Sequence, residues 1–171
     1  MLIHSATLAE ATPLIEALGL QKVYQKPYLL YQGPSHKLVI SGIGALHSAS
    51  ALGWALATDP QDVLNIGYAA GQKVGTLYNI HKVIDRCSDK VYHLTPSSAL
   101  PNATCETYPR PLHTPIKNLA DMEASAVVVT TRRFGRRCHI LKVVSDRFDP
   151  DLAPKDDRLI RLHISEILSL L

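Results

Sequence analysis

The segment from Leu119 to Asp149 constrains the fold more than any other part of the chain. Small and apolar residues from Ala124 to Phe134 predict a buried helix, with two arginines in its last turn and Gly135 after it. The β-branched run from His139 to Val144 is continuous rather than alternating, which predicts a strand covered on both faces. A helix followed by such a strand is typical of α/β folds.

Two acidic residues lie at the edges of this helix–strand unit. Glu123 precedes the helix, and Asp146 follows the strand directly. Ligands of open α/β sheets bind at the carboxyl ends of the strands, so both carboxylates are candidates for a binding site. Each also has a purely structural explanation, because Glu123 could favour the positive end of its helix and Asp146 could cap a turn with Ser145.

Five short motifs surround these carboxylates or precede them along the chain. They are Ser41-Gly42-Ile43-Gly44, Asn65-Ile66-Gly67-Tyr68-Ala69-Ala70-Gly71, Val74-Gly75-Thr76-Leu77, Asp121-Met122-Glu123-Ala124-Ser125-Ala126 and Val143-Val144-Ser145-Asp146. Together they resemble the signature of the purine nucleoside phosphorylase and methylthioadenosine/adenosylhomocysteine nucleosidase superfamily. The resemblance is weak between Ser88 and Asn118. It implies a three-layer α/β/α sandwich with a mixed central sheet, formed by residues 1–171 as a single domain, which suits a chain of this length.

The resemblance also implies the roles of individual residues. Asp146 would protonate the purine at N7, and Glu123 would accept hydrogen bonds from the ribose hydroxyls while Met122 packs on the sugar. Breaking an N-ribosidic bond leaves a positive sugar and an electron-rich base, so a proton donor and a carboxylate both lower the barrier. We expect Ser145, Tyr68 and Ala69 to bind the substrate as well.

Glu10 has two explanations. Thr12-Pro13 predicts the start of the first helix, which ends at Gly19, and this places Glu10 in the loop or the loose first turn between strand and helix. Aligning residues 5–10 with the corresponding turn of the nucleosidases gives Glu10 the role of activating the attacking water. Alternatively, Thr7 and Glu10 form a capping box.

The end of the strand Val63–Ile66 and the turn after it carry residues that distinguish the two branches of the superfamily. The phosphorylases hold phosphate with an arginine where this chain has Asn65, which favours water over phosphate as the acceptor. Tyr68 stands where the nucleosidases carry a serine, and it would narrow the pocket or stack on a base.

No cofactor or metal is expected. The glycines at 42 and 44 partly resemble a dinucleotide-binding fingerprint, but His47 stands where the third glycine belongs, so they more simply permit a tight turn before a helix from Ala45 to Ala57. The histidines and cysteines lack the spacing of metal ligands.

The remaining segments predict further elements. Strands are expected at Met1–Ser5, Tyr24–Tyr31 and Lys37–Ile40, and an amphipathic helix from Asp156 to Leu171. The interval from Asp85 to Asn118 should lack helix because it contains five prolines: Pro96, Pro101, Pro109, Pro111 and Pro115. It is shorter than in the superfamily, and its candidates for covering the base are Tyr92, His93 and Tyr108.

These features favour hydrolysis of a purine nucleoside, of the adenosine type with a modified 5′ end. The alternatives are a nucleoside-binding relative without activity and a phosphate-dependent phosphorylase. The partners expected are a small-molecule nucleoside and, from the resemblance, a second copy in a homodimer. The net charge is only +3, and the one dense basic cluster (Arg132, Arg133, Arg136 and Arg137) suits a helix end, so no nucleic-acid partner is expected.

The chain is expected to be cytoplasmic and free of membrane contacts. No apolar run approaches the roughly 18 residues of a membrane-spanning helix. The N-terminus lacks a basic region before an apolar stretch, so a signal peptide is not expected. The three cysteines are odd in number and suit reduced thiols.

Overall fold

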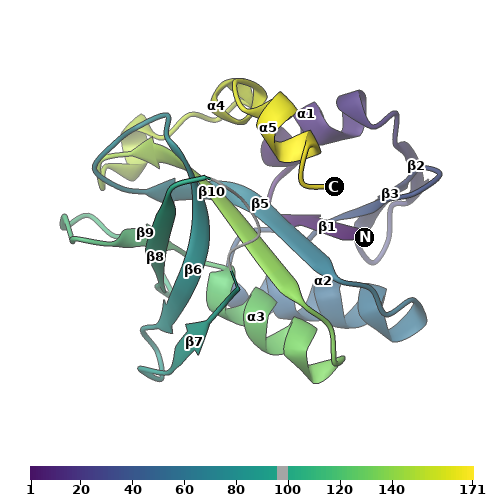
Figure 1. Ribbon diagram of the computed structural model, residues 1–171, viewed down its shortest axis with the longest axis horizontal. Coiled ribbons are helices and arrows are strands. Elements are labelled where there is room, and N and C mark those ends of the chain that lie inside the picture. Colours follow the sequence, from purple (N-terminus) through teal and green to yellow (C-terminus); the bar gives the residue numbers. More distant parts are fainter. Residues whose placement is uncertain (96–99) are drawn as a thin grey trace.

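Ten strands form one mixed sheet in residues 1–95 and 100–171, the part of the chain that the computed structural model describes (Figure 1). The strands are β1 (Leu2–Ser5), β2 (Gln21–Tyr24), β3 (Leu29–Gln32), β4 (Lys37–Ile40), β5 (Val63–Ala70), β6 (Leu77–Asp85), β7 (Val91–His93), β8 (Asn102–Thr107), β9 (Leu119–Asp121) and β10 (Cys138–Asp146). The helices are α1 (Leu8–Ala17), α2 (Ala45–Thr58), α3 (Ala124–Arg133), α4 (Arg158–Arg161) and α5 (Ile164–Leu168), with a 3₁₀ turn at Pro150–Leu152.

The sheet closes on itself over half of its width. Its strand order is β10-β6-β8-β9-β5-β1-β4-β3-β2, with β7 on the side of β6. Because β10 also pairs with β5, the strands β5, β10, β6, β8 and β9 form a closed ring. Strands β4, β1, β5 and β10 are parallel, so their carboxyl ends meet at one edge of the sheet.

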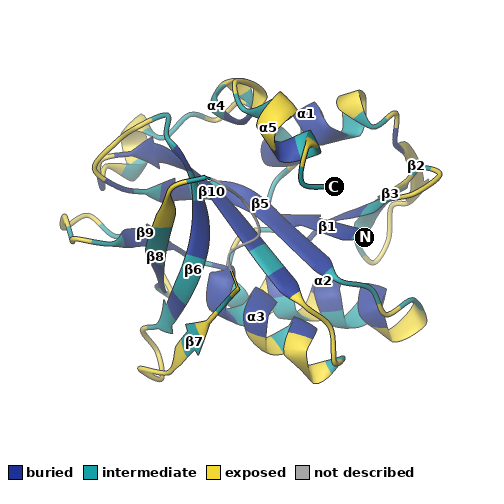
Figure 2. Ribbon diagram, in the orientation of Figure 1, coloured by how far each residue is buried: buried dark blue, intermediate teal, exposed yellow. Residues whose placement is uncertain are grey.

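Helices cover both faces of the sheet, with α1, α4 and α5 on one side and α2 and α3 on the other (Figure 1). Successive residues of the apolar strands point to opposite faces. Leu2 joins the core beneath α2 and α3, whereas Ile3 joins the core beneath α1 and α5. The central strands are therefore buried along most of their length (Figure 2), which explains their continuous apolar runs. The predicted three-layer α/β/α sandwich with a mixed sheet is confirmed.

The predicted start of the first helix is wrong. Helix α1 begins at Leu8, and Pro13 lies inside it. Thr7 caps the helix by accepting a hydrogen bond from the Glu10 amide, and the Glu10 carboxylate accepts one from the Thr7 amide. This capping box, the structural alternative considered above, satisfies two of the free amides at the helix start and outweighs the proline signal at 12–13.

Other segments differ from the prediction in extent. The closing helix is two helices, α4 and α5, separated near His163, whose ring nitrogen Nε2 lies 2.7 Å from the Gly75 carbonyl oxygen. The strand predicted at Tyr24–Tyr31 is instead the hairpin of β2 and β3. Strand β5 runs four residues past Ile66, through the glycine-containing motif.

The proline-rich interval contains strands β7 and β8 and no helix among its described residues, as predicted, while Pro96 lies outside them. Within the residues that the structure describes, no helix is long and apolar enough to cross a membrane.

Candidate functional site

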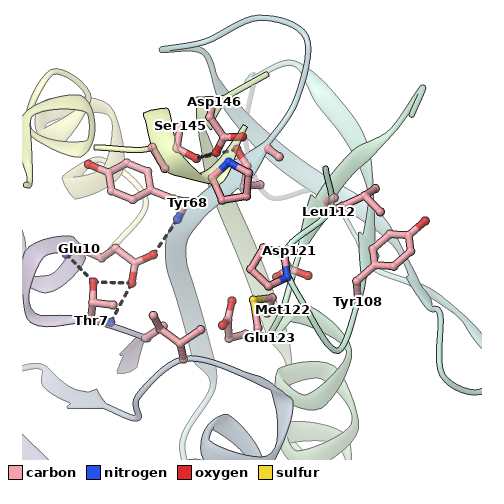
Figure 3. A pocket seen from close by; sticks show the side chains of 18 of the residues that line it. Thr7, Glu10, Tyr68, Tyr108, Leu112, Asp121, Met122, Glu123, Ser145 and Asp146 are labelled. Atoms are coloured by element: carbon pink, nitrogen blue, oxygen red, sulfur yellow. Dashed lines mark hydrogen bonds between the residues drawn. The ribbon is translucent and has the colours of Figure 1, made fainter. Parts of the chain in front are cut away.

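A cavity of about 420 Å³ opens at the carboxyl ends of β5 and β10 (Figure 3). All seven residues singled out from the sequence line it: Glu10, Tyr68, Ala69, Met122, Glu123, Ser145 and Asp146. They come from α1, β5, the start of α3 and the end of β10, which are far apart in the sequence. The structure thus brings the predicted site together, while the role of each residue remains a prediction.

Glu10 is held firmly on one side of the cavity. Its Oε2 atom accepts hydrogen bonds from the Thr7 amide (2.8 Å) and hydroxyl (3.0 Å), and its Oε1 atom accepts one from the Tyr68 amide (2.8 Å). An ionised carboxylate offers about four acceptor positions, so these three donors leave about one for another ligand. The capping box therefore fixes the side chain without using all of its capacity to bind.

Gly67 makes this arrangement possible. A Cβ atom at this position would lie 2.9 Å from Glu10 Oε1 and 3.4 Å from Lys142 Nζ. Real Cβ atoms essentially never approach an oxygen atom so closely. A larger residue would therefore displace the Glu10 carboxylate, which packs directly on the backbone of β5.

Glu123 faces the cavity from the start of α3, beside Met122 (Figure 3). Its Oε1 atom accepts a hydrogen bond from the Gly44 amide at 2.7 Å. The glycine turn after β4 therefore holds a carboxylate, and Gly44 has the left-handed φ of +105° that this turn needs. Burial raises the pKa of Glu123 to about 7, and the nearby carboxylates Asp121 and Glu10 add to this rise, whereas Lys142 and the Gly44 amide oppose it.

Asp146 is aimed into the cavity by an irregularity at the end of β10. Val144 pairs with Ala69 and Asp146 with Ala70, so Ser145 is an extra residue in the strand, as in a β-bulge. The Asp146 Oδ2 atom lies 2.6 Å from the Ser145 hydroxyl, and Oδ1 accepts a hydrogen bond from the Asp149 amide at 2.9 Å. Both oxygens of this buried carboxyl group therefore have a defined partner.

Solved structures show which fold this arrangement belongs to, although no protein-family model matches the chain and no curated protein sequence is significantly similar to it. A methylthioadenosine/adenosylhomocysteine nucleosidase from Helicobacter pylori, crystallised with butyl-thio-DADMe-Immucillin-A, superposes with a TM-score of 0.79 at 17% identity, covering 99% of this chain and 96% of the other. The Arabidopsis thaliana methylthioadenosine nucleosidase gives 0.84 at 16% identity, covering 99% and 93%. A futalosine hydrolase mutant from Helicobacter pylori gives 0.77 at 17% identity, covering 99% and 98%.

This chain has the nucleosidase fold. At these identities the similarity establishes the fold alone, so activity and substrate rest on the site itself.

One charged pair beneath the cavity of this nucleosidase-fold chain was not found from the sequence. Lys142 Nζ lies 2.8 Å from Asp121 Oδ2, and both side chains are completely buried. Burial by itself lowers the pKa of Lys142, but the carboxylates of Asp121 and Glu123 outweigh it and leave that pKa raised. The sequence does contain an indication of this pair, because a lysine inside an apolar strand that is covered on both faces needs a partner of opposite charge.

The opposite wall of the cavity was only partly found. Tyr108 lines it together with the segment from Arg110 to Leu112. Tyr92 and His93, the other aromatic candidates, do not line it, because both belong to β7, where Arg132 covers the Tyr92 ring and donates a hydrogen bond to the His93 carbonyl. Residues 153–155 and Pro150, after β10, complete the wall.

Asn65, which stands in place of the phosphorylase arginine, does not line the cavity of this nucleosidase fold. Its side-chain amide donates to His4 Nδ1 at 2.9 Å, and the other ring nitrogen lies 3.0 Å from the Ser41 hydroxyl. Burial lowers the pKa of His4 to about 3, so the ring is neutral and this network is structural. Among the described residues there is no cluster of histidine, cysteine and acidic side chains that could hold a metal ion.

Proposed function

We propose that this protein hydrolyses the N-ribosidic bond of a purine nucleoside and releases the free base. The substrate would be of the adenosine type with a modified 5′ end, such as methylthioadenosine, adenosylhomocysteine or a futalosine-like compound. The observation that carries this proposal is the convergence of Glu10, Glu123 and Asp146, each buried and each held differently, on one cavity. The nucleosidase fold supports it.

The three carboxyl groups suit three separate roles. Cleavage makes the ribose positive, and Glu123 in its ionised form can accept hydrogen bonds from the ribose hydroxyls that strengthen as this charge develops. Glu10 has about one free acceptor position with which to orient and deprotonate a water molecule.

Asp146 can donate a proton to the base through an arrangement that accommodates both of its charge states. The Ser145 hydroxyl lies 2.6 Å from Asp146 Oδ2 and 3.3 Å from the Ala69 carbonyl oxygen. When Asp146 is ionised, the hydroxyl donates to it. When Asp146 is protonated, the hydroxyl can donate to Ala69 instead, so proton transfer to the base leaves no buried donor unpaired.

The test is release of adenine or hypoxanthine from a panel of 5′-modified adenosines and inosines in phosphate-free buffer. Asp146→Asn should abolish turnover, since an amide cannot supply the proton. Asp89→Asn is the matched control, because Asp89 is a highly exposed residue in the turn between β6 and β7. Absence of base release from every substrate, with and without phosphate and at high protein concentration, would contradict the enzyme proposal.

Two alternatives make different predictions in the same assay. The Tyr68 ring at the cavity wall favours a nucleoside-binding protein without activity, which would bind ligands without turnover. A phosphorylase would release base only when phosphate is added, and the inward-turned Asn65 argues against it.

We further propose that the protein is a cytoplasmic homodimer. Ile43, which lines the cavity, is 57% exposed, and Leu46, at the start of α2, is 80% exposed. A partner surface would cover both. The three free cysteines are consistent with a reducing compartment. Light scattering on the purified protein and cell fractionation test these two statements separately.

A further inference from the structure

The cavity is acidic at its base and basic at its outer part. The acidic residues that line it are at most 7% exposed: Glu10, Asp121, Glu123 and Asp146. Arg110 and Lys155 also line it, and both are exposed. Within the described part of the chain, neither cation has an acidic partner within 4 Å, so their charge is available to a ligand.

Arg110 projects from a constrained backbone. Pro109 and Pro111 flank it and restrict the chain on both sides. The preceding Tyr108 is anchored twice, because its amide donates to the Asp121 carbonyl oxygen at 2.8 Å and its hydroxyl donates to Glu106 at 2.8 Å. The position of Arg110 at the cavity is thus set by the fold.

Lys155 is fixed in a similar way on the other wall. It follows Pro154, and the carbonyl oxygen of the next residue, Asp156, accepts a hydrogen bond from the Tyr68 hydroxyl at 2.9 Å. Tyr68 itself is half-buried, and burial raises its pKa to about 12, so its hydroxyl stays protonated as a donor. This bond ties the segment after β10 to the sheet and keeps Lys155 beside the cavity.

The acidic residues of the same loop do not cancel this charge at the cavity. Asp149, Asp151 and Asp156 are exposed but do not line it. Asp156 and Asp157, which also do not line it, are paired with Arg158 and Arg161. The wall around the two cations is apolar, formed by Pro111, Leu112, Pro150, Ala153 and Pro154. A nucleoside with a neutral outer end would form no ion pair with the two cations on this surface. A carboxylate or phosphate group would bind both of them.

We propose that the substrate carries an anionic group, a carboxylate or a phosphate ester, at the end that reaches the outer cavity, where Arg110 and Lys155 bind it. This inference rests on the proposed function, since it assumes that the sugar lies among the buried carboxylates. The sugar would become positive beside the acidic base of the cavity, and the negative outer group would lie beside the basic opening. The charges of the substrate would thus complement those of the cavity.

Binding and turnover of a graded ligand series test the inference. Adenosine and 5′-methylthioadenosine are the neutral ligands, a 5′-carboxymethylthioadenosine carries the carboxylate, and adenosine 5′-monophosphate carries the phosphate. Affinity is measured by calorimetry on the Asp146→Asn variant, and kcat/KM on the wild type. We expect the affinity and the kcat/KM of the better anionic ligand to exceed those of the neutral ligands by about tenfold in 50 mM salt, and by less in 500 mM salt.

Substitution of the two cations should remove this preference selectively. Arg110→Ala and Lys155→Ala should each weaken anionic ligands by about three- to tenfold and leave neutral ligands unchanged within about twofold. Arg133→Ala is the matched control, because Arg133 lies in the last turn of α3, about 15 Å along the helix from Glu123.

The outcomes separate this inference from the proposed function. Equal affinity for neutral and anionic ligands, or equal losses for both in the two variants, would overturn it. Base release from neutral nucleosides that requires inorganic phosphate would also overturn it, because the cations would then bind the co-substrate. A selective loss of anionic binding without any turnover would support the inference while the hydrolase proposal fails.

Discussion

Glu123 should make the stability of this protein fall as the pH rises from about 4.5 to 7. Its pKa is raised from the ordinary 4.5 to about 7 mainly by burial, so the folded state holds a proton that the unfolded state has already lost in this range. The penalty is absent below pH 4.5 and fully present above pH 7. Because one pKa unit corresponds to about 1.4 kcal/mol, the complete penalty is about 3 kcal/mol of unfolding free energy.

Glu123→Gln isolates this contribution, since a glutamine keeps the shape of the protonated acid and can still accept the Gly44 hydrogen bond. Urea unfolding of both proteins is measured at pH 5 and pH 8. The stability of the variant relative to wild type should increase by about 2–3 kcal/mol between these values. Parallel pH profiles would refute the reasoning and place the titration elsewhere.

Three further substitutions probe the structure around the site. Lys142→Met should cost about 3–5 kcal/mol in urea unfolding because it leaves Asp121 buried without its counter-charge, and adding Asp121→Asn should recover part of it. Gly67→Ala should lower kcat/KM by about ten- to a hundredfold, because the new Cβ displaces the Glu10 carboxylate. The accompanying decrease in Tm should be small. Tyr68→Phe should speed trypsin cleavage of the loop after β10 by about two- to tenfold, because its hydroxyl holds that loop. Unchanged rates relative to a Tyr28→Phe control would contradict this last expectation.

The sequence predicted the parts of the site that depend on local pattern. Glu123 and Asp146 flank a helix and a strand that periodicity identifies, and the carboxyl ends of parallel strands necessarily meet at one edge. The seven candidate residues therefore reached one cavity even though the start of α1 was placed wrongly. The family resemblance, not the periodicity, singled out Glu10.

The parts that were missed depend on contacts between distant segments. Strand β9 has only three residues, and its pairing with β5 and β8 closes the ring that carries Asp121 to Lys142. Nothing within three residues of sequence indicates such a pairing. The wall around Arg110 was missed for the same reason. Arg110 lies at the cavity because of the hydrogen bond between Tyr108 and β9.

The buried Lys142 explains how several acidic groups can occupy so small a space. Its ammonium group is paired with Asp121, whose Oδ1 and Oδ2 atoms also accept hydrogen bonds from the Thr107 hydroxyl and the Ala124 amide. Asp121 is thereby neutralised and fully bonded, and it acts as part of the scaffold. Glu10 and Glu123 then differ mainly in the donors that face them, three for Glu10 against the single Gly44 amide for Glu123. Ionising the buried and sparsely bonded Glu123 is therefore costly in the free protein. A ribose whose hydroxyls donate to it, and which becomes positive during cleavage, would relieve that cost where the reaction needs it most.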